Sequence, residues 1–302
     1  MAHNHNHTST AIKGKKLLWV ALLNIAITIV QIVGGILANS LSLLSDALHN
    51  LGDSSAIFIA FLAGKHSEKQ ADKSKTFGYK RIEILAALFN AVTLIVISLF
   101  LFYEAYKRFL KPEPIHGKLM IIVAFVGLLA NLVSVLLLQK EKDHNLNIRA
   151  AYLHLIGDTL SSVAVILGGI AIWLYDIVWI DPLITVLVGI YIIYHTWHVV
   201  NETVSILMQA SPKNIDLDNI KKEIESLETV ANLHHIHVWQ LDDKQVHLEA
   251  HINLKKDLKL SETNDIREEI TELLYHDFQI NHTTLQIEFN CCEEEELIVT
   301  SN

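Results

Sequence analysis

The fold is decided by two apolar stretches that carry charged side chains in their interiors. They read LSLLSDALHNLGDSSAIFIAFLA at Leu41–Ala63 and AAYLHLIGDTLSSVAVILGGIAIWLY at Ala150–Tyr175. Each is long enough to cross a bilayer as a helix, which takes about 20 residues. A carboxylate inside such a segment costs about 2.5–3.5 kcal/mol on insertion scales and is tolerated mainly where it faces a partner, a cavity or an ion. The two stretches therefore predict a polar site inside a helical membrane domain.

Four further apolar stretches of similar length predict six transmembrane helices in all. The six spans are Leu17–Leu37, Leu41–Ala63, Ile82–Phe102, Leu119–Leu138, Ala150–Leu174 and Val178–Val200. The first is too long for the core of a signal peptide and has no small-residue cleavage site after it, so it is kept as a helix. The expected domains are an N-terminal tail at 1–16, a six-helix membrane domain at 17–210, a cytoplasmic domain at 211–290 and an acidic tail at 291–302.

The chain after residue 210 has the pattern of a small soluble domain. Helical periodicity at Asp216–Val230 and Thr263–Phe278 is interleaved with strand-like alternation at Leu233–Leu241, Gln245–Leu254 and Thr283–Phe289. The order αββαβ predicts helices packed on a sheet. We therefore expect an α-helical membrane protein that ends in a small αββαβ domain.

Composition excludes two classes of protein. The 302 residues are 51% hydrophobic and 19% charged, with a net charge of -9, whereas a nucleic-acid binder needs a clustered basic face. The two cysteines are adjacent, at Cys291 and Cys292, which excludes a disulfide scaffold. We expect partners other than nucleic acid.

Lysine and arginine near the spans predict the orientation in the membrane. Basic residues precede the first span and fill the loops after the second and fourth, whereas the turns after the first and fifth carry none. The loop after the third span departs from this bias with Lys107, Arg108, Lys111 and Lys118. The balance favours both termini in the cytoplasm. The compact loops and the lack of a targeting peptide favour a bacterial inner membrane.

The polar residues inside the second and fifth spans have the spacing of a metal site. His49 and Asp53 are four residues apart, and so are His154 and Asp158. Residues four apart lie on one face of a helix, one turn above the other. If the two helices face each other, two imidazole nitrogens and two carboxylate oxygens converge, a donor set that suits tetrahedral Zn²⁺. Binding of a metal displaces protons from such ligands, so the same site predicts exchange of metal for protons.

Two other classes of membrane protein fit parts of this pattern. An intramembrane zinc hydrolase usually keeps three protein ligands and an open position for water, whereas four ligands are available here and the spans contain no His-Glu-x-x-His motif. A proton-coupled carrier of an organic solute would use His and Asp only as proton relays and would need a larger midplane cavity with interrupted helices. Metal transport is the preferred interpretation.

The chain resembles the cation diffusion facilitator family of metal transporters over nearly its whole length. The stretches that carry the resemblance are LLSDALHNLGD at 43–53, TFGYKRIEILAALFNA at 76–91, HLIGDTLSSVAV at 154–165 and HIHVW at 235–239. The resemblance implies a homodimeric, proton-coupled exporter of divalent transition metals with a metallochaperone-like tail. One histidine on each ligand helix is similar to the zinc-transporting members, some of which handle Co²⁺ or Cd²⁺, and imidazole likewise favours zinc.

The resemblance also implies a regulatory metal site in the tail at His234, His251 and Glu288, and His282 is a further candidate for this site. Alternation along the first strand places Leu233 with His235 and His237 on one face, and His234 with Ile236 on the other. In the N-terminal tail, His3, His5 and His7 alternate with asparagine, a pattern that suits transient metal capture as well as a plain polar tail.

Overall fold

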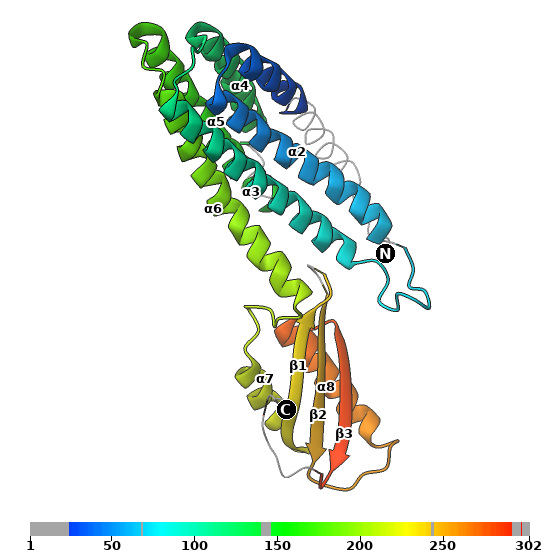
Figure 1. The fold of residues 1–302 in the computed structure, drawn as a ribbon. Helices are drawn as coiled ribbons and strands as arrows, with labels where there is room; N and C mark the ends of the chain where they lie inside the picture. Colours follow the sequence, from blue (N-terminus) through cyan, green and yellow to red (C-terminus); the bar gives the residue numbers. More distant parts are fainter. Residues whose placement is uncertain (1–23, 68, 140–145, 243–244, 292–296, 298–302) are drawn as a thin grey trace, which may run out of the picture. The chain divides into compact units, whose positions relative to one another are not determined.

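A computed structural model describes residues 24–67, 69–139, 146–242, 245–291 and 297 of the chain. The described residues fall into two compact units, one formed by residues up to 62 and 86–200 and the other by 63–85 and 201–302. His3, His5 and His7, for which the sequence suggested transient metal capture, lie outside the described residues. Five long helices form the bundle (Figure 1): α2 (Leu41–Ser67), α3 (Arg81–Leu110), α4 (Gly117–Leu138), α5 (Leu146–Tyr175) and α6 (Ile180–Leu207).

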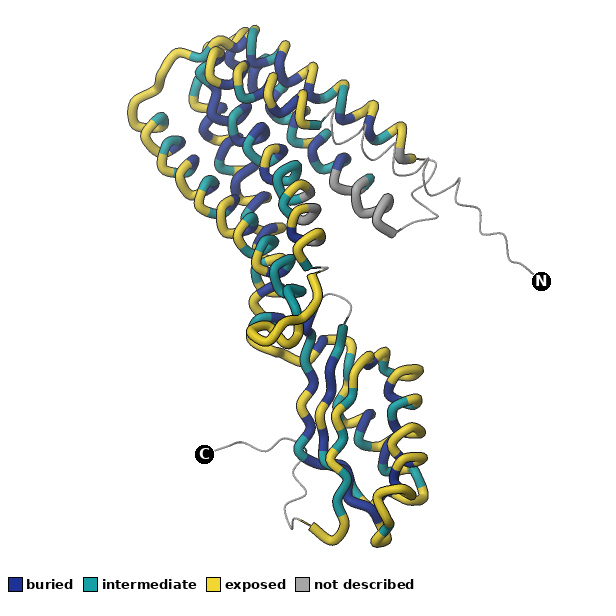
Figure 2. Tube along the Cα trace, turned by 90° about the vertical axis from the view of Figure 1, so that its right-hand side faces the viewer, coloured by how far each residue is buried: buried dark blue, intermediate teal, exposed yellow. Residues whose placement is uncertain are grey.

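The bundle has the surface of a membrane domain. Among the described residues, α3, α4, α5 and α6 are long and apolar enough to cross a bilayer, and a shorter apolar helix, Asn24–Ala38, precedes α2. α2 has 27 residues, which at about 1.5 Å per residue spans about 40 Å, although polar side chains lower its hydropathy. Exposed residues lie along the outer faces of the helices (Figure 2), and many are large and apolar, such as Phe89 and Leu160. The predicted helical membrane domain is confirmed.

α4 and α5 approach closely through glycines. A Cβ atom built on Gly117 would lie 2.9 Å from the carbonyl oxygen of Gly169, and one built on Gly169 would lie 2.8 Å from the Ile121 side chain. Such distances leave no room for a side chain at either position. Small residues let membrane helices pack backbone to backbone. The glycines therefore set the position of α5, which carries two of the predicted metal ligands.

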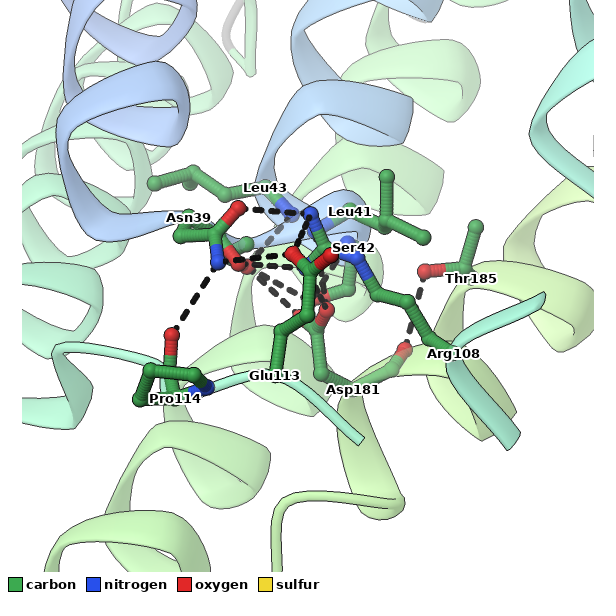
Figure 3. A network of polar contacts seen from close by, with 10 residues as sticks. Asn39, Leu41, Ser42, Leu43, Arg108, Glu113, Pro114, Asp181 and Thr185 are labelled. Atoms are coloured by element: carbon green, nitrogen blue, oxygen red, sulfur yellow. Dashed lines mark hydrogen bonds and ion pairs between the residues drawn. The ribbon is translucent and has the colours of Figure 1, made fainter. Parts of the chain in front are cut away.

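A buried carboxylate fastens the start of α2 to the start of α6 (Figure 3). Asp181 is fully buried and accepts hydrogen bonds from the hydroxyls of Ser40 and Ser42, both at 2.6 Å. It also accepts the backbone N–H groups of Leu41 at 2.8 Å and Ser42 at 3.2 Å, which are first-turn donors without partners inside the helix. Arg108, near the end of α3, lies 3.7 Å from the same carboxylate. The network joins three helices at one end of the bundle.

The second unit contains the predicted αββαβ domain. Its elements are α7 (Leu217–Glu225), β1 (Val230–Gln240), β2 (Val246–Leu254), α8 (Thr263–Phe278) and β3 (His282–Phe289). The sheet order is β1-β2-β3, with β1 antiparallel and β3 parallel to β2. Alternate residues of β2, such as Leu248 and Ile252, pack with apolar residues of α7 and α8, so both helices cover one face. The opposite face carries His247, Glu249 and His251.

α7 is shorter than the predicted helix, which ran on to Val230. Asp216 caps its start by accepting the N–H groups of Asp218 and Asn219. The helix ends at Glu225 because Val230 is already in the sheet, paired with Leu254 and fully buried. The predicted helix was too long because apolar residues with helical spacing continue past Glu225. Leu227 and Val230 are among them, and both pack in the core without being part of α7.

A bulge in β1 overturns the predicted assignment of faces. The register with β2 shifts between His234 and His237, and His235 has a φ of 49°. An extra residue in one strand shifts the alternation of all that follow. Leu233 and Ile236 are both buried in the core, so Leu233 does not share a face with His235 and His237, nor His234 with Ile236. The prediction of strict alternation is wrong at this point.

Candidate metal sites

The transport site predicted from spacing is compact across α2 and α5. The Nε2 atom of His49 lies 3.5 Å from Asp53 Oδ2 on its own helix and 3.5 Å from Asp158 Oδ1 on α5. The Asp158 side chain is 1% exposed and that of His49 is 11% exposed. Three of the four predicted ligands therefore meet in the interior of the bundle. His154 lies on α5 one turn before Asp158, and its side chain is outside the described residues.

A second buried carboxylate holds the ligand helices together beside this site. Asp46, one turn before His49, accepts hydrogen bonds from Ser161 of α5 and from Gln31 of the helix Asn24–Ala38, both at 2.6 Å. Asn50 donates to the Gln31 side chain at 3.0 Å. The sequence alone does not mark Ser161, because the neighbouring Thr159 and Ser162 are equally polar and nothing in their spacing distinguishes one from the others. The bridge fixes the separation of α2 and α5 where their ligands face each other.

The chemistry of this group allows two different occupants of the His49 Nε2 position. An ion pair of His49 with the two carboxylates requires a proton on the imidazole. A metal ligand requires the lone pair of the same nitrogen and two ionised carboxylates. The group can therefore hold either a proton or a cation, with the same three side chains in place.

A second group of metal-ligand residues lies on the open face of the sheet. Ligand atoms of His234 on β1, His251 on β2 and Glu288 on β3 all lie within 4.8 Å of one another. His251 Nδ1 lies 3.0 Å from one Glu288 oxygen, and His234 Nε2 lies 3.4 Å from the other. Because His234 and His251 are direct partners in the sheet, the strand register brings them together.

The contacts of His234 leave its Nε2 atom available to bind a metal ion. Its Nδ1 lies 2.9 Å from the Asn232 amide oxygen, which can only accept, so Nδ1 carries the proton and Nε2 has a free lone pair. His234 Nε2 and Glu288 Oε2 are both buried and have no hydrogen-bond partner among the described residues. Burial lowers the pKa of His234, although the Glu288 carboxylate opposes this shift. A neutral imidazole facing a buried carboxylate oxygen fits a zinc ion well.

His282 is not part of this group in the described part of the chain. It stands beside His247 in the parallel register of β2 and β3, with the two rings 4.8 Å apart. Trp239 stacks on the other side of His247 at 5.4 Å. The structure thus separates the further candidate His282 from His234, His251 and Glu288.

Comparison with known proteins matches both units. Residues 17–208 match the family model of the cation efflux transmembrane domain, and residues 212–290 match that of the cation efflux protein cytoplasmic domain. The cadmium, cobalt and zinc/H(+)-K(+) antiporter of Bacillus subtilis is 39% identical over 291 residues, which cover 95% of this chain and 92% of the relative. The zinc transporter ZitB of Pectobacterium atrosepticum is 36% identical over 98% of this chain and 91% of its own length. The metal cation efflux system protein CzcD of Cupriavidus metallidurans is 35% identical over 97% and 91%.

These matches agree with the structure, in which a helical membrane domain with ionisable side chains in its interior is followed by a small helix-and-sheet domain. The chain belongs to the cation efflux family, the cation diffusion facilitators. Members of this family are secondary transporters, so the protein is a metal-efflux transporter and not an enzyme.

Proposed function

We propose that the protein exports Zn²⁺ from the cytoplasm in exchange for protons, and accepts Co²⁺ and Cd²⁺ as further substrates. The transport ligands are His49, Asp53, His154 and Asp158. The observation that carries this proposal is the contact of His49 Nε2 with carboxylates of both α2 and α5. The names of the relatives, which include cadmium, cobalt and zinc, support the choice of metals.

Transport follows from competition at this site. Zinc arriving from the cytoplasm binds the deprotonated imidazoles and carboxylates and displaces their protons. When the helices rock and the site opens outward, external protons bind these groups and release the metal. Four protein ligands would otherwise hold zinc too tightly for rapid turnover, so protons supply the step that empties the site.

The proposed orientation places both termini in the cytoplasm of a bacterial cell, with the protein in the inner membrane. The basic loop after the third span was the exception to this orientation. Arg108 in that region lies close to Asp181 and Glu113, and Lys107 donates to Glu104 at 3.0 Å. Because these charges have acidic partners, they weigh less in the orientation than the bases of the other loops. The proposed domains remain 1–16, 17–210, 211–290 and 291–302.

The tail is proposed to sense cytoplasmic zinc through His234, His251 and Glu288. Binding there would join β1, β2 and β3 on the open sheet face. We propose that this favours the homodimer and transport when metal is abundant. His282 remains a proposed fourth ligand that would have to move to reach the other three.

The test uses purified protein in liposomes that contain a zinc indicator and a pH indicator, with an acidic interior. We expect external zinc to enter while internal protons leave. Asp158→Asn should abolish both signals, whereas Asp176→Asn, an exposed carboxylate in the turn before α6, should retain them. Replacing potassium by choline on both sides should leave the exchange unchanged. Wild-type flux in Asp158→Asn would contradict the site, and flux that requires potassium would contradict proton exchange alone.

A further inference from the structure

A cavity of about 490 Å³ in the bundle exposes two of the proposed transport ligands. Its walls come from α2, α3 and α6, and include His49, Asp53 and Asn90 together with Tyr191 and His195 of α6. We call this space the access cavity. α6 carries none of the proposed ligands, yet its His195 contributes a second imidazole, beside that of His49, to the same space.

The position of His195 along the bundle can be worked out from the network at the other end. Leu41 and Asp181 are in contact, so α2 and α6 start at the same level. With a rise of about 1.5 Å per residue, His49 lies about 12 Å, Asp53 about 18 Å and His195 about 21 Å from that level. His195 is therefore farther than either ligand from the end we propose to face outward. In the proposed orientation it therefore lies on the cytoplasmic side of His49 and Asp53.

Tyr191 orients the imidazole from one turn before it. The two rings are 4.5 Å apart at 63°. The Tyr191 hydroxyl lies against Gly157 of α5, where a Cβ atom would come within 2.5 Å of it. Since Gly157 immediately precedes Asp158, the hydroxyl is seated beside the transport site. The contact with Gly157 fixes the position of the Tyr191 ring, and the His195 imidazole packs against that ring.

We infer that His195 is a transient ligand that takes a divalent metal ion from the cytoplasmic opening of the access cavity and passes it to Asp53 and His49. Imidazole binds zinc, cobalt and cadmium well, whereas magnesium and calcium prefer oxygen ligands. A single protein ligand holds a metal weakly enough to release it onward. His195 would thus select for transition metals before they reach the site. This inference rests on the proposed function for the identity of the transport ligands.

The first test is zinc flux as a function of zinc concentration in His195→Gln. We expect the KM for zinc to rise about tenfold while the maximal rate stays within a factor of two, because access is impaired and the transport ligands are intact. The matched control is His198→Gln, an exposed histidine of α6 that does not line the access cavity. An unchanged KM in His195→Gln, or equal effects of the two substitutions, would overturn the inference.

A second test does not depend on transport. In a protein whose two cysteines are replaced by serine, the thiol introduced by His195→Cys is alkylated with a maleimide in the presence or absence of Cd²⁺. We expect cadmium to protect this thiol and to leave the thiol introduced by His198→Cys reactive. Equal reactivity with and without cadmium at position 195 would overturn the inference. Protection without any wild-type flux would instead contradict the proposed function and leave His195 as a metal ligand.

Discussion

Replacing Asp181 by asparagine should loosen the end of the bundle where α2 and α6 begin. The carboxylate accepts two serine hydroxyls at 2.6 Å and two backbone N–H groups at 2.8 and 3.2 Å, and it is completely buried. An asparagine of the same shape keeps one acceptor oxygen and turns an NH₂ group toward donors. Oδ1 accepts three of the four bonds and Oδ2 accepts one, so the substitution can retain at most three of them.

The expected loss follows from the bonds that are weakened. A hydrogen bond to a charged group contributes about 1.5–3 kcal/mol, so losing one bond and the charge on the others should lower the free energy of unfolding by about 3 kcal/mol. At about 2–4 °C per kcal/mol for a domain of 150–250 residues, the size class of the membrane domain at 17–208, the melting temperature should fall by about 6–12 °C. Removal of the charge also leaves Arg108, 3.7 Å away, without this partner.

The assay is thermal unfolding of the full-length protein in detergent, followed by size-exclusion chromatography after heating. Asp176→Asn is the control, since Asp176 is an exposed carboxylate in the turn just before α6 and its positive φ of 53° is one that asparagine adopts readily. A melting temperature for Asp181→Asn within 2 °C of that control would refute the account of the network.

Three further outcomes are expected. Burial and the neighbouring His282 lower the pKa of His247, so its contribution to stability is present above the ordinary value near 6.5 and is lost as the pH falls through the folded value. The protection factors of β2 amides in the full-length protein, which correct for the intrinsic exchange rate, should therefore fall below pH 6.5, and less so in His247→Gln; an equal fall would contradict this. Asn232→Ala should weaken zinc binding at the tail site by about 10–100-fold in a chelator competition, through loss of the contact that orients His234; unchanged affinity would show that Asn232 is dispensable. Gly169→Leu should separate α4 from α5 and lower the melting temperature, at a cost of about 1–3 kcal/mol; a wild-type melting temperature would mean that the helices are not closely packed there.

Patterns that depend on burial in lipid were predicted well from the sequence. Length and apolarity alone identify the four helices α3, α4, α5 and α6. A helix that crosses lipid can be recognised in this way because its apolar surface is needed whatever it packs against. The contact between α2 and α5 was also predictable, since carboxylates at fixed spacing in two apolar helices need each other or an ion. The αββαβ order was predicted correctly from periodicity. The end of α7 was not, because the helical spacing continues to Val230, which is the first residue of β1.

What the sequence could not predict depends on contacts between distant residues. The bulge at His235 changes which side chains share a face, and no local signal marks it. The strand register separates His282 from Glu288, and register is set by the folded sheet. Asp181 was overlooked because an acid at the start of an apolar span looks like an ordinary boundary residue. Its partners, Ser40 and Ser42, are about 140 positions earlier in the chain.

X-ray absorption of zinc bound to the full-length protein tests the central claim most directly. The tail site is first disabled by His234→Ala and His251→Ala, so that zinc at the transport site gives the signal. The account predicts one zinc per chain with two imidazole nitrogens and two oxygens at about 2.0–2.2 Å, and loss of one imidazole in His154→Ala. An all-oxygen or sulfur-containing shell, or a spectrum that His154→Ala leaves unchanged, would contradict a His/Asp site shared by α2 and α5.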